Sequence, residues 1–106
     1  MKRKVLASCF SDKKGNHENN LFDGGYYYSE LSIAPKKKDF KALGDLKNGH
    51  KLRITYNGKS IVATKADVGA GGPSKPQIDI HWTAAKALGI SNPDNFLAAV
   101  EIEDIQ

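Results

Sequence analysis

The 106-residue chain lacks several features that would place it in a well-marked protein class. It has one cysteine, Cys9, so it can form neither an intramolecular disulfide nor a cluster of thiolate metal ligands. It has no apolar run near the roughly 18 residues that a membrane-spanning helix needs. No pair of histidines stands at metal-ligand spacing. We therefore predict no metal, no cofactor and no membrane contact.

The chain also lacks a recognisable secretory leader. Its basic start is followed by the apolar letters VLASCF, which are fewer than the roughly 7–15 residues of a signal-peptide core. We interpret Lys4–Phe10 as a strand instead. A lone cysteine in such a strand is more typical of a small buried hydrophobe than of a nucleophile activated by His17, His50 or His81.

Composition and charge are those of an ordinary globular protein, with 40% hydrophobic and 26% charged residues. The length predicts one domain over residues 1–106, which we expect to be a monomer. The net charge of +4 favours polyanions such as nucleic acids or anionic wall polymers. However, the basic runs Lys2–Lys4 and Lys36–Lys38 have no interleaved aromatics, so they are more typical of a solvated face. We predict no nucleic-acid partner and keep that class as the weakest alternative.

The clearest local pattern is a hairpin. Alternating apolar residues over 52–56 lead to Asn57-Gly58, and alternation resumes over 61–63, which predicts two strands joined by a type I′ turn. Before it, YYYSELSIAP predicts a strand that ends at Pro35. Residues 37–46 predict one or two helical turns.

The last third of the chain predicts a strand, a short helix, a turn and a strand. QIDI over 77–80 is the first strand, and WTAAKALG over 82–89 is a helix that ends at Gly89. SNPDN predicts a turn. The final strand, FLAAVEIEDI, offers Val100, Ile102 and Ile105 to the core.

Three of these segments together resemble a known family. LKNGHKLRITYNGKSIVATKADVGAGG, IDIHWTAAKALGI and AAVEIED are similar to the double-psi β-barrel domain of rare lipoprotein A, the expansins and related bacterial and phage cell-wall proteins. The match covers about Ala7 to Glu103, and Asp79 precedes Gly89 by the spacing of the family. The loop DVGAGGP and His81 depart from the family's DRGP and serine. The resemblance implies a mainly β fold, a small six-stranded double-psi β-barrel with one or two short helices.

The resemblance also implies a function. In lytic transglycosylases of this fold, an aspartate equivalent to Asp79 is both general acid and general base in cleaving peptidoglycan glycan strands. Apolar Ile78 and Ile80 would favour its protonated form by desolvation. Asp67 and Glu30 are further candidate catalytic residues. Two structural alternatives remain open: Asp67 as a turn former before glycine, and Asp79 as a cap of the following helix.

Candidate substrate-binding residues are Trp82, His81, Tyr26, Tyr28 and Gly71. Aromatic faces suit the apolar faces of sugar rings, but Trp82 could equally fill the core, the tyrosines could alternate inward, and an exposed histidine is common at a helix start. The predicted partner is peptidoglycan, and the predicted location is extracellular, in the cell envelope or in a phage virion. The alternative function is a non-catalytic, expansin-like module that binds a wall polysaccharide or a partner protein.

Overall fold

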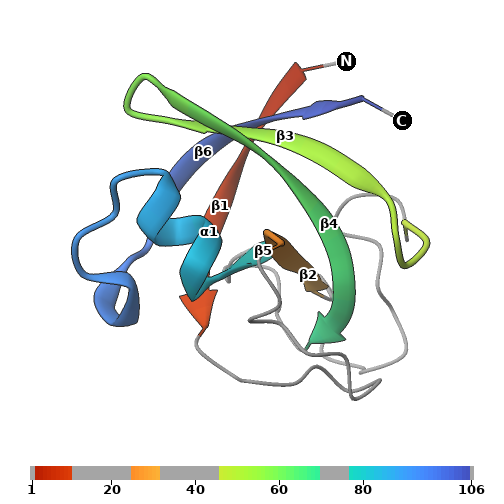
Figure 1. Cartoon of the computed structure of the whole chain (residues 1–106), viewed down its shortest axis with the longest axis horizontal. Helices are drawn as coiled ribbons and strands as arrows, with labels where there is room; N and C mark the ends of the chain where they lie inside the picture. The colour runs from red at the N-terminus through yellow and green to blue at the C-terminus, as the bar shows by residue number, and fades with distance from the viewer. Residues whose placement is uncertain (1, 11–24, 32–45, 70–76, 106) are drawn as a thin grey trace.

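A computed structural model describes residues 2–10, 25–31, 46–69 and 77–105 of the chain, with the backbone alone for 67–69. The described part is mainly β, as predicted, and its strands form one six-stranded sheet (Figure 1). The elements in chain order are β1 (Lys2–Phe10), β2 (Tyr27–Leu31), β3 (Lys51–Tyr56), β4 (Lys59–Gly69), β5 (Ile78–His81), α1 (Trp82–Ala87), the 3₁₀ helix η1 (Pro93–Asn95) and β6 (Ala98–Asp104).

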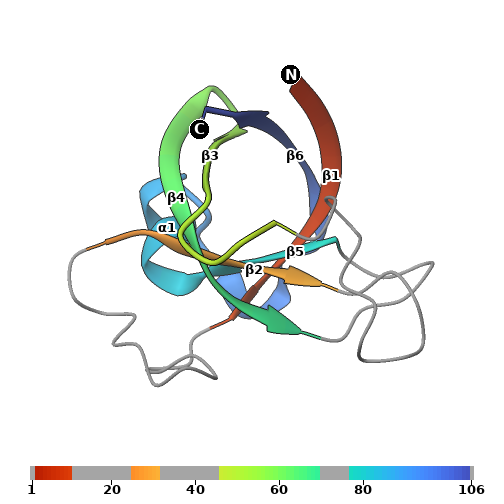
Figure 2. The same ribbon diagram turned by 90° about the vertical axis from the view of Figure 1, so that its right-hand side faces the viewer.

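The sheet closes on itself. Its strand order is β1-β5-β2-β4-β3-β6, and β6 returns to pair with β1. Two of the pairs, β1 with β5 and β2 with β4, are parallel, and the others are antiparallel. Figure 2 shows β1, β6, β3 and β4 curving round a ring whose lower side is crossed by β2 and β5. Each of the six described strands therefore pairs with two neighbours.

The predicted hairpin is confirmed. β3 and β4 pair from Tyr56 and Lys59 outward, and the two turn residues have positive φ, 51° at Asn57 and 82° at Gly58. Positive φ at both central positions is the mark of a type I′ turn, which asparagine and glycine tolerate best. β4 then continues to Gly69, so a single long strand pairs with β3 at one end and with β2 at the other.

The predicted helix is also confirmed. It ends in a Schellman motif: Gly89, with φ of 82°, donates its N–H to the Lys86 carbonyl, and Ile90 donates to Ala85. The N-cap residue is His81, whose side chain makes no capping hydrogen bond. Asp79 is therefore not the N-cap of this helix, against that alternative.

The core lies inside the closed sheet and beneath α1. Strands contribute alternate residues, as in β3, where the buried Leu52 and Ile54 follow the exposed Lys51 and Arg53 in turn. The prediction of Ile105 as a core residue is wrong: it follows the end of β6 and is 38% exposed. The buried apolar cluster comprises Val5, Ala7, Tyr28, Leu52, Ile54, Ala63, Ile78, Ile80, Ala84, Ala85, Leu88, Ile90, Val100 and Ile102.

Other predicted elements differ or lie outside the described residues. SNPDN, predicted as a turn, contains η1. The predicted helical turns over 37–45 lie outside the described residues, as does the basic run 36–38. The other basic run does face acidic partners, because Lys2 pairs in register with Glu103 and Lys4 with Glu101. Within the described ranges, no helix is both long and apolar enough to cross a bilayer.

Candidate functional site

Asp79 lies on the outer face of the closed sheet. Its neighbours Ile78 and Ile80 belong to the core cluster, and successive residues of a strand point to opposite faces. The Asp79 side chain is half-buried, and its Oδ1 accepts a hydrogen bond of 3.0 Å from the hydroxyl of Ser8 on β1. A carboxyl group on a strand that is paired on both sides is held in place more firmly than one on a loop.

Small polar residues continue the row on both sides of Asp79. Ser8 on β1 pairs in register with Asp79, and Asp79 pairs with Ser29 on β2. Ser29 in turn pairs with Asp67 on β4, after a register shift in β2 between Tyr28 and Ser29. We call Ser8, Asp79 and Ser29 the outer polar row. The backbone of Asp67 continues this row, and its side chain lies outside the description.

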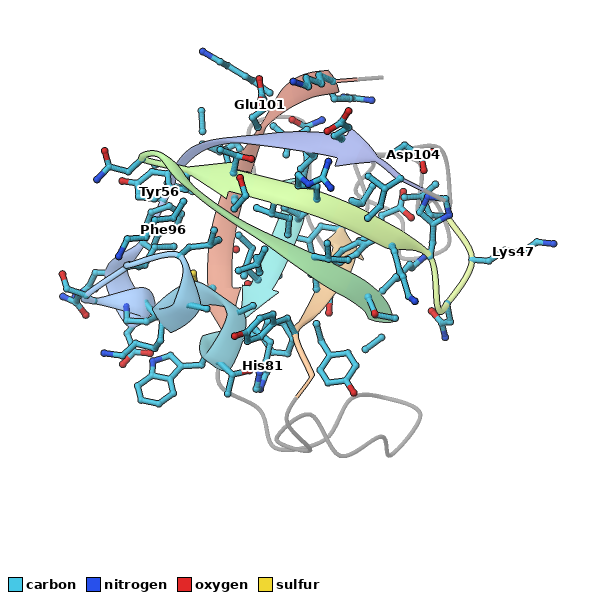
Figure 3. All side chains as sticks on the ribbon, turned by 45° about the horizontal axis from the view of Figure 1, so that its top comes forward. Lys47, Tyr56, His81, Phe96, Glu101 and Asp104 are labelled. Carbon is cyan, nitrogen blue, oxygen red and sulfur yellow. The ribbon has the colours of Figure 1, made fainter. Side chains whose placement is uncertain are left out.

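His81, two residues after Asp79 on β5, has a buried side chain. Its ring makes an edge contact with Phe10 of β1, with centroids 5.1 Å apart, and its Nδ1 lies 3.0 Å from the Thr83 hydroxyl. The side chain is fully buried, below the helix start (Figure 3). The predictions of His81 as a substrate contact and as an exposed histidine are both wrong for this structure, because a packed ring has no surface to offer.

Glu30 lies apart from Asp79, although their strands are neighbours. Glu30 is one residue beyond Ser29, the register partner of Asp79, so it points to the opposite face of the sheet. Its side chain is 0% exposed, and that of Lys65 is 3% exposed. Lys65 donates from Nζ to Glu30 Oε1 at 3.0 Å. This burial contradicts the predicted role of Glu30 as a second catalytic carboxylate.

The Glu30–Lys65 ion pair also fixes the chain before β3. The N–H of Leu46 donates to Glu30 Oε1 at 2.7 Å, and Lys65 donates to the Leu46 carbonyl. Both backbone groups of Leu46 are therefore satisfied by one buried pair. Such satisfaction matters because a buried charge without a partner is costly.

Tyr28 is the third inward polar group of this region. It is fully buried in the core cluster, and its hydroxyl donates to the His50 carbonyl at 3.2 Å. Burial, followed by the nearby Glu30 and Asp104 carboxylates, raises the pKa of Tyr28 above its usual range. A buried ring cannot stack on a sugar, so the prediction of Tyr28 as a substrate contact is wrong, and the inward alternative holds for it.

The remaining predicted site residues have varied positions. Tyr26 is 38% exposed just before β2, where it could meet a ligand. Trp82 is half-buried at the start of α1, with Lys86 Nζ 5.4 Å from its ring centroid. It is thus neither a buried core residue nor a bare platform. Gly71 lies outside the described residues.

Cys9, predicted to be a small buried hydrophobe, is only partly buried. It packs against the core cluster from β1. Burial, then the charges of Asp79 and Asp94, raises the pKa of its thiol to about 12. The thiolate needed of a nucleophile is therefore scarce at neutral pH.

A search against protein-family models and a search of curated protein sequences each found no match to the chain.

Among the described residues, no group of three His, Cys, Asp or Glu side chains gathers where a metal ion could bind. The sequence analysis missed Ser8, Ser29 and Lys65. Lys65 carried a signal, because the alternation of Ile61 and Ala63 along β4 places it at an inward position.

Proposed function

We propose that this chain is a double-psi β-barrel domain of the rare lipoprotein A and expansin-like type. The proposal is that it acts on peptidoglycan glycan strands at Asp79. The observation that carries it is the outer polar row: a half-buried carboxyl group, hydrogen-bonded by Ser8 and flanked by Ser29 on a closed sheet. The two parallel strand pairs within a closed six-stranded order support the fold part of the proposal.

The proposed chemistry needs a single carboxyl group. Asp79 gives its proton to the glycosidic oxygen as the bond from the muramyl C1 to that oxygen breaks. It then takes the proton of the muramyl 6-hydroxyl as that oxygen bonds to C1, so that a 1,6-anhydro ring closes. One proton moves from one sugar oxygen to the other through the carboxyl group. The burial of Glu30 is consistent with this scheme, because the scheme uses no second carboxylate.

The test uses purified glycan strands and mass spectrometry of their ends. We expect new anhydro-muramyl ends with the wild type and none with Asp79→Asn, because an amide cannot exchange the proton. Asp94→Asn is the matched control: Asp94 is an exposed aspartate on η1, and its variant should produce the same ends as the wild type. If the wild type makes no ends, or if Asp79→Asn makes as many, the enzymatic proposal is wrong.

A second candidate is the non-catalytic module that binds a wall polysaccharide. One contact favours it: the Ser8 hydroxyl donates to Asp79 and thereby stabilises the ionised carboxylate, whereas a general acid must begin protonated. For this candidate, wild type and Asp79→Asn would both sediment with insoluble peptidoglycan and leave its strand ends unchanged. If neither protein sediments with peptidoglycan, this candidate is excluded.

A further inference from the structure

A pocket lies on a different part of the molecule from the outer polar row. Its volume is ≈ 440 Å³, which is within the about 300–1,000 Å³ typical of small-ligand sites. It is formed where the β3–β4 hairpin turn meets the end of α1, η1 and the start of β6. Its lining residues are Tyr56, Asn57, Gly89, Ile90, Ser91, Asn92, Asn95, Phe96, Leu97 and Ala98.

The walls of this pocket are built from rigid local structure. The type I′ turn at Asn57 forms one side, and the Schellman motif at Gly89 forms another. η1 is held by backbone hydrogen bonds from Asn95 to the Asn92 carbonyl and from Phe96 to the Pro93 carbonyl. The rings of Tyr56 and Phe96 meet edge to face, with centroids 5.1 Å apart (Figure 3). The pocket is therefore formed before a ligand arrives, which lowers the entropic cost of binding.

Among the described residues that line the pocket, none has a charged side chain. A cationic ligand would lose hydration there without gaining a counter-charge, so the lining disfavours cations. Lys59 adds to the selection against cations, because its Nζ lies 3.2 Å from the point that a Cβ on Gly89 would occupy. A cationic group entering beside Gly89 would meet a like charge.

The polar side-chain groups of the lining are three carboxamides and the hydroxyls of Ser91 and Tyr56. Each of Asn57, Asn92 and Asn95 carries both a donor and an acceptor, as a sugar hydroxyl does. Tyr56, Phe96 and the 60% exposed Leu97 add apolar surface beside them. A ring that has apolar C–H faces and a rim of hydroxyls satisfies both kinds of surface at once.

We propose that this pocket binds a neutral sugar ring. The site is distinct from the outer polar row, since none of Ser8, Ser29 and Asp79 lines it. Sugar binding here needs no catalysis at Asp79, so this proposal can be correct even if the function proposed above is wrong, and the reverse also holds.

The test is a titration of the ¹⁵N-labelled full chain with N-acetylglucosamine, followed by amide chemical shifts. We expect shifts of the amides at 56–57 and 89–98, with millimolar affinity. Glucosamine, the same ring with an ammonium group, should bind at least several-fold more weakly. No shift of these amides with N-acetylglucosamine, or equal binding of the two sugars, would overturn the proposal.

Two variants locate the contact. Asn92 is the N-cap residue of η1 but makes no side-chain cap, so Asn92→Ala should keep the fold and weaken binding roughly twofold to tenfold. Asn95→Ala gives an independent second test. Asn48→Ala is the matched control, because Asn48 is an exposed asparagine in the turn before β3. If both Asn92→Ala and Asn95→Ala bind as tightly as the wild type, the sugar is not held in this pocket.

Discussion

The two faces of the sheet treat their acidic residues in opposite ways. On the inner face, Glu30 is fully enclosed and shares its Oε1 between Lys65 and the Leu46 N–H. On the outer face, Asp79 is half-buried and accepts a hydrogen bond from the neutral Ser8 hydroxyl. The two residues are on adjacent strands and differ by one register position. The comparison teaches that the face of a strand decides whether a carboxylate is enclosed with a lysine or lies half-buried beside a neutral hydroxyl.

The largest expected effect is the removal of one partner of the inner pair. Lys65→Met leaves the Glu30 charge enclosed without its cation, so we expect a loss of about 3–5 kcal/mol in the free energy of unfolding, measured by urea denaturation. Lys47→Met, at an exposed lysine of the same chain segment, should change it by less than about 0.5 kcal/mol.

A double variant separates the enclosed charge from simple loss of contacts. Glu30→Leu combined with Lys65→Met should be more stable than Lys65→Met alone, because no uncompensated charge remains. If Lys65→Met lowers the free energy of unfolding no more than Lys47→Met does, the contrast between the two faces is wrong.

An intermediate effect concerns the reactivity of Cys9. Because burial and the Asp79 and Asp94 charges raise the pKa of this thiol from its ordinary 9.0 to about 12, its thiolate fraction at pH 8 should fall roughly a thousandfold. The higher nucleophilicity of a more basic thiolate offsets part of this loss, so alkylation by iodoacetamide should be about thirtyfold slower in the native chain than in urea.

Asp79→Asn sharpens this measurement. It removes one of the negative charges that raise the thiol pKa, and so it should speed native alkylation at constant pH. The rate should rise with pH in both proteins, since the thiolate is the reacting form. Equal rates in native and unfolded chains would show that Cys9 is not held as described.

The smallest expected effect is on the outer face. Ser8→Ala removes one hydrogen bond to a half-buried group, so we expect a loss of about 0.5–1.5 kcal/mol by the same urea measurement. Ser60→Ala is the matched control, since Ser60 Oγ lies 2.7 Å from Thr55 Oγ1 on the exposed surface of the hairpin. If Ser8→Ala lowers the free energy of unfolding as much as Lys65→Met does, the outer polar row stabilises the fold as strongly as the inner ion pair, and the two faces do not differ in this respect.

Local features of the fold could be predicted from the sequence. The hairpin follows from alternation around Asn57-Gly58, and the end of α1 follows from Gly89, because these conformations depend on neighbouring residues. The error at Ile105 has a simple cause. The alternation of Val100 and Ile102 leads to position 104 and not to 105.

The site could be predicted only in part, because its partners are distant along the chain. Ser8 and Asp79 are 71 residues apart and meet through the parallel pairing of β1 with β5, which no local pattern encodes. The face of Glu30 depends likewise on the register between β2 and β5. The alternation along β4 places Lys65 at an inward position, but the reason for a buried lysine there is visible only once its partner Glu30 is known.

The pairing of β1 has a consequence for how the protein is made. β1 is the first of the six described strands in the chain, yet its two neighbours are the last two, β5 and β6. Val5 and Ala7 are buried in the folded protein, so they stay exposed until β5 and β6 have been synthesised and can pair with β1. Folding of this domain should consequently be slow, because closing the sheet joins strands that are far apart in the chain.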